Sequence, residues 1–133
     1  MKIFVDTNIF LDVLLGRENY PSSLRVLEGV LAGEWEGVVL DITLLNIDYV
    51  ARKQTKDIRE FLNLVNDAFA VVGAGNAEME EALAMETPDL EDNLQYLCAL
   101  RSGCGLIVSN DRDFVKGELP VVSSLEFVKN MSE

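Results

Sequence analysis

Histidine is absent from this chain of 133 residues. Its absence excludes the catalytic triads that use an imidazole as base. It also removes the commonest ligand of zinc and of other transition metals. The chain has only two cysteines, Cys98 and Cys104, whose spacing matches no zinc or redox motif. We interpret them as one thiol in the core and one in a turn.

Basic residues are scarce, with 11 Lys and Arg against 23 Asp and Glu, for a formal net charge of -12. This balance counts against a large sequence-independent surface for nucleic acid, which needs cations on the phosphates. It does not exclude nucleic-acid chemistry, because a bound divalent metal reverses the local sign of an acidic pocket. Arg112 and Lys116 flank the last acidic cluster and are candidates for phosphate contacts.

Long apolar runs are also missing, since none approaches the ~20 residues needed to cross a bilayer. Asp6 and Asn8 interrupt the apolar start, and no small-residue cleavage site follows, so we predict no signal peptide. We expect a cytoplasmic protein with no membrane contact. The length and the 49% hydrophobic content predict a single domain over residues 1–133 with a full core.

Short apolar runs alternate with segments of helical periodicity. This alternation predicts an α/β fold with a mostly parallel central sheet of about five strands and helices on both faces. Thr43 is expected to cap a helix running to Lys53, and Thr87-Pro88 to start a later one. The expected strands are Lys2–Val5, Gly37–Leu40, Ala70–Val72, Leu106–Val108 and Val121–Val122.

Acidic residues stand where these elements end or begin. Asp6 directly follows the first strand, Asp111 and Asp113 follow Leu106–Val108, and Asp92 lies in the first turn of a helix. In open α/β sheets ligands bind at the carboxyl ends of the strands. Crowded carboxylates repel one another unless a cation compensates them, so we predict a metal site. A site made only of oxygen ligands suits Mg²⁺ or Mn²⁺.

Each acid also has a purely structural interpretation. Asp6 could be the N-cap of the following helix. Asp92 could complement the helix dipole, an interpretation that fits Asp89 and Glu91 better. The two acids after the late strand could belong to an Asx-type turn.

Three stretches, taken together, resemble the PIN domain, a family that includes the VapC-type toxins of toxin–antitoxin pairs. They are Val5-Asp6-Thr7-Asn8, Glu91-Asp92 and Ser109-Asn110-Asp111-Arg112-Asp113-Phe114. They span nearly the whole chain in the right order. The first stretch alone is weak, but its combination with the last is fairly specific. The resemblance implies a three-layer α/β/α domain and a Mg²⁺- or Mn²⁺-dependent ribonuclease site.

The resemblance also implies roles for individual residues. Asp6, Asp92 and Asp111 would be metal ligands, and Asp113 an accessory acid. Asn8 and Ser109 would orient the carboxylates by hydrogen bonding.

The chain departs from the family pattern at position 46. PIN domains commonly carry a glutamate on the helix after the second strand, where this chain has Asn46. Asparagine offers a carbonyl oxygen but no charge, so Asn46 is either a site residue of a subfamily or a structural amide. Asp48 is two helical positions further, about 200° around the helix, and is a poor substitute.

Two functions of different classes follow. The first is a metal-dependent ribonuclease, a candidate toxin of a VapBC-type pair with an antitoxin partner. The second is a catalytically silent PIN-like module that binds RNA or protein. A homodimer is compatible with both, and the apolar segments Ile9–Leu15 and Leu24–Leu31 are either its interface or core. A phosphotransfer domain is disfavoured, because position 8 is Asn and no lysine follows Val121-Val122.

Overall fold

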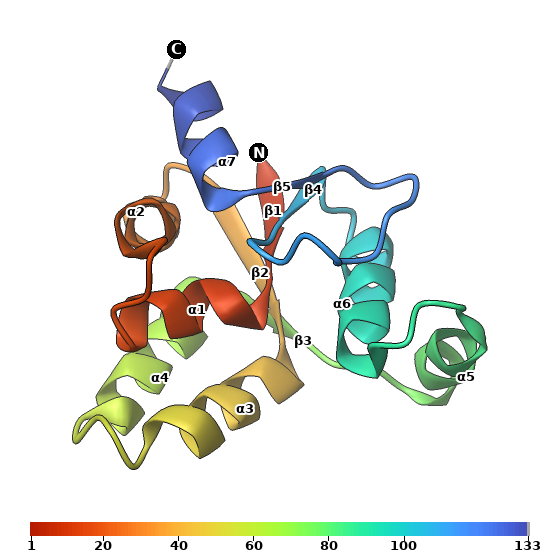
Figure 1. Cartoon of the computed structure of the whole chain (residues 1–133), viewed down its shortest axis with the longest axis horizontal. Coiled ribbons are helices and arrows are strands. Elements are labelled where there is room, and N and C mark those ends of the chain that lie inside the picture. Colours follow the sequence, from red (N-terminus) through yellow and green to blue (C-terminus); the bar gives the residue numbers. More distant parts are fainter. Residues whose placement is uncertain (133) are drawn as a thin grey trace.

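The computed structural model describes residues 1–132, in which five strands alternate with helices (Figure 1). The strands are β1 (Lys2–Val5), β2 (Glu36–Leu40), β3 (Ala70–Val72), β4 (Leu106–Val108) and β5 (Val121–Val122). The helices are α1 (Thr7–Leu14), α2 (Tyr20–Leu31), α3 (Asp41–Ala51), α4 (Ile58–Ala68), α5 (Asn76–Ala84), α6 (Leu90–Arg101) and α7 (Ser124–Met131). All the expected strands are present, and the predicted α/β class is confirmed.

The sheet has the order β3-β2-β1-β4-β5, and its pairings are parallel. The chain moves outward from β1 to β3 and then crosses to the other side of β1 to form β4. The connections leaving β1 and β4 therefore diverge, which opens a crevice at the carboxyl ends of these strands. Val5 pairs with Val108, and the next residue, Asp6, donates its backbone N–H to the Val108 oxygen at 3.1 Å.

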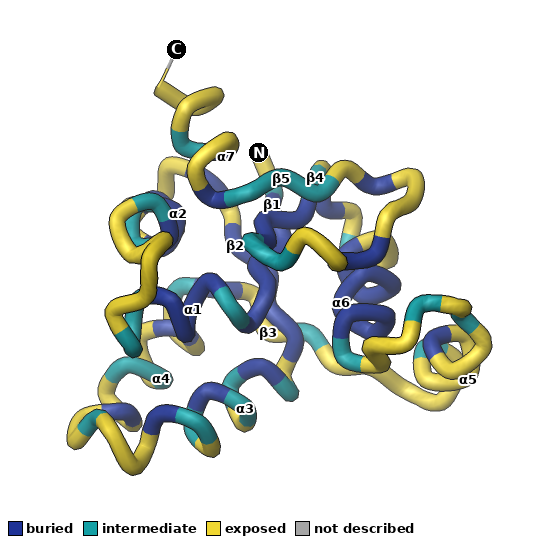
Figure 2. Tube along the Cα trace, viewed as in Figure 1, coloured by how far each residue is buried: buried dark blue, intermediate teal, exposed yellow. Residues whose placement is uncertain are grey.

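Apolar side chains cover both faces of the sheet. Ile3 and Val5 of β1 join a core with α1, α2, α3, α4 and α7, whereas Phe4 joins a second core with α5 and α6. Figure 2 shows the central strands β1, β2 and β4 largely buried, whereas the edge strands β3 and β5 and the outer surfaces of the helices are more exposed. Parallel strands buried on both sides read as unbroken apolar runs, which is why the sequence located them. The three-layer prediction is confirmed.

Helix α3 begins earlier than expected. Strand β2 continues into it without a loop, and Leu40 has the extended backbone of an N-cap (φ -77°, ψ 140°). Thr43 is consequently inside the first turn and 0% exposed, with its hydroxyl oxygen 2.8 Å from that of Thr7. The prediction that Thr43 caps the helix is wrong, because a side chain turned toward a buried partner does not reach the free backbone N–H groups.

Both cysteines are free, and both are buried, including Cys104, which was expected in a turn. Burial raises the pKa of Cys104 to about 11, so its thiol stays protonated and unreactive. Among residues 1–132, no helix combines the length and apolar character that crossing a membrane requires.

Helix α2 packs closely on Trp35 through Gly29. The Trp35 indole N–H donates to the Val26 oxygen at 3.0 Å, and the ring meets Phe127 of α7 edge-on at 4.9 Å between centroids. A Cβ on Gly29 would overlap the indole ring. The glycine is therefore needed for close approach rather than for an unusual backbone conformation.

We expect Gly29→Ala to lower the free energy of unfolding by about 1–3 kcal/mol, because overpacking moves the ring from its site. This cost outweighs the ~1 kcal/mol that alanine gains in a helix interior. Urea denaturation measures the change. Glu28→Ala, on the exposed side of the same helix, should stay within about 0.5 kcal/mol of wild type. Equal stability of Gly29→Ala and wild type would contradict this account.

Candidate active site

A cavity of about 250 Å³ lies at the carboxyl end of β1. Four separate parts of the chain form it: the start of α1, the middle of α3, the start of α6 and the loop after β4. None of the residues lining it is lysine or arginine, so the charge it presents is negative. The lining residues are Asp6, Thr7, Asn8, Leu11, Asn46, Tyr49, Val50, Asp89, Glu91, Asp92 and Asp111.

Asp6 is the most buried acid of this cavity, at 1% exposure. Its Oδ1 accepts a hydrogen bond from Gln95 Nε2 at 2.9 Å, and its Oδ2 accepts one from Ser109 Oγ at 2.7 Å. Burial raises the pKa of Asp6, although both hydrogen bonds favour the charged form. Asp6 occupies the N-cap position of α1, but its side chain makes no capping hydrogen bond. The N-cap interpretation therefore does not account for the side chain.

Gln95 of α6 is 0% exposed and connects two elements. Its Oε1 accepts from the backbone N–H of Thr7 at 3.3 Å, while its Nε2 donates to Asp6. These two partners need opposite ends of the amide, so they define its orientation. Gln95 thereby holds the start of α1 and the Asp6 carboxylate against α6.

Asp92 lies one turn earlier on α6 and is 6% exposed. Its backbone N–H donates to Oδ1 of Asp89, which caps the helix, at 3.0 Å. Burial, with the added charges of Asp6, Asp89 and Asp111, raises the pKa of Asp92 to about 8. Without a cation, Asp92 is therefore mostly protonated at neutral pH.

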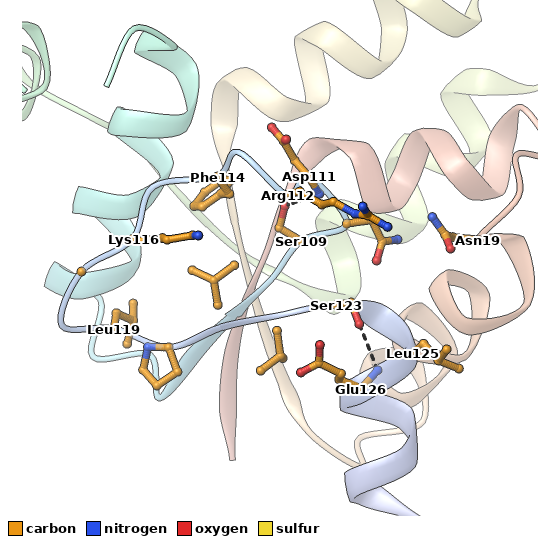
Figure 3. Close-up of a pocket in the computed structure, with 15 residues that line it drawn as sticks. Asn19, Ser109, Asp111, Arg112, Phe114, Lys116, Leu119, Ser123, Leu125 and Glu126 are labelled. Atoms are coloured by element: carbon orange, nitrogen blue, oxygen red, sulfur yellow. Dashed lines mark hydrogen bonds between the residues drawn. The ribbon is translucent and has the colours of Figure 1, made fainter. Parts of the chain in front are cut away.

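Asp111 is half-buried and belongs to a tight turn after β4. Its backbone N–H donates to Ser109 Oγ at 3.1 Å, and its Oδ1 accepts from the backbone N–H of Asp113 at 2.9 Å. This is the Asx-type turn that the structural interpretation predicted. Asp111 also lines a second cavity of about 570 Å³, next to Arg112 and Lys116 (Figure 3). It is thus the one lining residue that the two cavities share.

Asn46 and Glu91 form the remaining wall. Asn46 Nδ2 donates to Glu91 Oε1 at 2.6 Å, and Thr7 Oγ1 donates to Glu91 Oε2 at 2.8 Å. The Thr7 hydroxyl is also paired with that of Thr43. This network connects α1, α3 and α6 around the cavity.

The sequence model of the PIN domain matches residues 2–113. The chain belongs to the PIN-domain family. Its relatives include Ribonuclease VapC1 of Aquifex aeolicus (strain VF5), which is 31% identical over 137 residues that span 95% of this chain and 92% of the relative. The family predicted from the sequence is confirmed.

Solved structures share the fold of this PIN domain. A toxin–antitoxin complex from Klebsiella pneumoniae matches with a TM-score of 0.70 and 20% identity, over 92% of this chain and 97% of that one. Mycobacterium tuberculosis VapC20, described as a toxin that cleaves the sarcin–ricin loop, matches with a TM-score of 0.66 and 14% identity, over 84% and 92%. At such identities the likeness establishes the fold.

Most of the predicted site residues of this PIN domain come together. Asp6, Asp92, Asp111 and Asn46 line one cavity, as their positions in the sequence led us to expect. Asp113 does not join them, because it is exposed and lines neither cavity. Its backbone, rather than its carboxylate, holds Asp111, so the structure offers no support for an accessory acid there.

Two expectations about the surroundings have different outcomes. Asp48 faces away from the cavity, as expected, and lies 3.8 Å from Arg52 and 3.7 Å from Arg59. Ser109 orients Asp6 as expected. Within residues 1–132 the side chain of Asn8 has no hydrogen bond, and the second orienting group is Gln95.

The sequence interpretation missed Gln95 and assigned too little to Glu91. The interpretation of Asp89 and Glu91 as acids that favour the start of a helix describes Asp89, which caps α6. It is incomplete for Glu91, because the two oxygens of Glu91 accept hydrogen bonds from side chains of α1 and α3. A signal was available, because Glu91 and Asp92 lie four and three residues before Gln95 and share its face of the helix. A polar stripe of this kind on a buried helix indicates partners across the core.

The donor set fits a hard divalent cation. Its candidate ligands are carboxylate oxygens. Burial and the neighbouring acids raise the pKa of Asp92, and a bound cation would offset both effects. In residues 1–132 no three Asp, Glu, Cys or His side chains already enclose a common point. Ribonucleases of the PIN family generally depend on divalent metals, which agrees with this donor chemistry.

The pKa of Asp92 predicts how stability changes with pH in the absence of metal. Because folding raises this pKa from 3.8 to about 8, the folded protein binds the proton more tightly. The resulting stabilisation is complete below about pH 4 and is lost as the pH rises through about 8. We expect the melting temperature in EDTA to fall over this range, and to fall less in Asp92→Asn.

Thermal unfolding of both proteins across this pH range checks the prediction. Asp67→Asn, an exposed change on α4, serves as control and should follow wild type. Parallel pH profiles for wild type and Asp92→Asn would show that Asp92 does not retain its proton on folding.

Proposed function

We propose that this PIN domain is a divalent-metal-dependent ribonuclease that hydrolyses RNA phosphodiester bonds. The observation that carries the proposal is the meeting of Asp6, Asp92 and Asp111 in one cavity without a basic side chain. These residues come from three separate segments, and each is placed by its own backbone element. The relative named as a ribonuclease, which matches nearly the whole chain, supports the same activity.

The cofactor we propose is Mg²⁺ or Mn²⁺, held by Asp6, Asp92 and Asp111. Both ions prefer oxygen ligands, and the chain has no histidine that would favour zinc. When bound, such an ion lowers the pKa of a coordinated water and so supplies hydroxide near neutral pH. With Asn46 in place of an acid, we expect one tightly bound ion rather than two.

The chain's own residues prepare this site. Gln95 and Ser109 each donate one hydrogen bond to Asp6, which holds the carboxylate in a single orientation. A carboxylate has about four acceptor positions, so these two bonds leave capacity for a cation. Asp92 must release its proton before it can act as a ligand, since metal ligands bind in their deprotonated form.

The larger cavity is the place we propose for the RNA strand. It meets the acidic cavity at Asp111, and Arg112 and Lys116 line it (Figure 3). The positively charged side chains of Arg112 and Lys116, beside the acidic cavity, would hold phosphates of the RNA next to the scissile bond. They would do so although the chain as a whole is strongly negative. The rest of the protein surface, which is acidic, would then repel RNA and would not bind it away from the site.

We further propose that the chain acts in the cytoplasm as the toxin of a VapBC-type pair, with residues 1–133 as one domain. Its free cysteines suit a reducing compartment. An antitoxin would cover the acidic cavity. A homodimer remains part of the proposal, but Ile9–Leu15 and Leu24–Leu31 mostly pack in the core and contribute little exposed surface to it.

We expect Asp6→Asn to lower metal-dependent cleavage at least about 100-fold, equivalent to ~3 kcal/mol of transition-state stabilisation, because it removes ligand charge. Cleavage of a mixed-sequence single-stranded RNA is measured with Mn²⁺, with Mg²⁺ and with EDTA. Asp67→Asn is the matched control and should keep wild-type activity.

A wild-type rate in Asp6→Asn would remove Asp6 from the site. If folded wild-type protein, free of antitoxin, cleaves nothing with either metal, the chain is the silent binding module instead. The observation that would favour this second function is the uncharged Asn46, which stands where PIN domains commonly carry a glutamate.

The toxin proposal makes a separate prediction. Expression of the wild-type chain in a bacterial host should arrest growth, whereas Asp6→Asn, which lacks ligand charge, should not. Co-expression of the protein encoded next to this chain should restore growth. Growth arrest that is as strong with Asp6→Asn would mean that toxicity does not come from cleavage at this site.

A further inference from the structure

Position 46 brings no charge to the acidic cavity, yet a carboxylate stands beside it. Glu91 reaches Asn46 from the start of α6, although the two residues are 45 positions apart in the chain. On this side of the cavity α3 contributes no acid, and α6 contributes Glu91 instead.

Glu91 is held in this position from two sides. Asn46 Nδ2 contacts one carboxylate oxygen at 2.6 Å and Thr7 Oγ1 contacts the other at 2.8 Å. Two short hydrogen bonds, one to each oxygen, fix the carboxylate in a single orientation. Each oxygen keeps a further acceptor position, and the side chain lines the cavity.

Glu91 lines the same cavity as Asp6, Asp92 and Asp111. Carboxylates gathered around one cavity repel one another. Two neutral side chains would connect α3 and α6 without this repulsion. An acid placed here therefore costs stability unless it has a cation to face.

We infer that Glu91 supplies the carboxylate that position 46 lacks, as a further ligand of the metal centre, and that Asn46 is the positioning residue that holds it. This inference rests on the proposed function. The amide at position 46 suits the arrangement, because a glutamate there would place two like charges in contact. This wall of the cavity thus carries its acid on α6 rather than on α3.

Binding of Mn²⁺, followed by isothermal titration calorimetry and by the electron paramagnetic resonance of the ion, tests the inference without any RNA. We expect Glu91→Gln to weaken Mn²⁺ binding at least about 10-fold. Glu60→Gln makes the same chemical change at an exposed position of α4 and should bind as wild type does. The paired exchange Asn46→Glu with Glu91→Gln should restore affinity to within about 3-fold of wild type, because it returns the acid to α3.

The outcomes separate the inference from the proposed function. If Glu91→Gln binds Mn²⁺ like wild type while Asp6→Asn does not, Glu91 is a structural link only and the ribonuclease proposal stands. If wild type binds neither Mn²⁺ nor Mg²⁺ and cleaves no RNA, both fall. Should Glu91→Gln not fold, the exchanged pair decides, since a loss of about 10-fold or more in that variant would overturn the inference.

Discussion

The burial of Asp6 sets the strongest constraint on this molecule. A carboxylate at 1% exposure is tolerated only if its oxygens have partners, and two elements far apart in sequence supply them. Ser109 can do so because parallel pairing of β1 with β4 brings it alongside Asp6. Gln95 can do so because α6 packs across the same edge of the sheet. The position of Asp6 thus depends on the register between β1 and β4 and on how α6 packs against the sheet.

The acids gathered at this same edge of the sheet lower the stability of the fold. Acids that follow β1, begin α6 and follow β4 face one cavity, and burial together with their mutual repulsion raises the pKa of Asp92 to about 8. Two apolar cores, one on each face of the sheet, offset this cost. The arrangement is common at functional sites, where charges that suit a ligand are kept at the expense of stability.

Position 46 illustrates how a site is read differently along the chain and in space. Along the chain, an asparagine stands where PIN domains commonly carry a glutamate, which suggests a weakened or silent site. In space, its amide holds Glu91 at 2.6 Å, and the number of acids lining the cavity is larger than the family motifs alone indicate. Charge at a metal site is a property of the cavity, and any element that reaches the cavity can supply it.

The sequence by itself determined the order of the elements and the family. Strands buried on both faces must be continuous apolar runs, so β1 and β4 were recognisable, and the acids that follow them mark the edge where ligands bind. The tertiary structure alone decided which side chains meet there. It placed Glu91 at the cavity and Gln95 behind Asp6, left Asp113 outside the cavity, and made Thr43 a buried partner of Thr7 rather than a cap. These contacts join residues tens of positions apart, and they depend on strand register and helix packing, which no local pattern encodes.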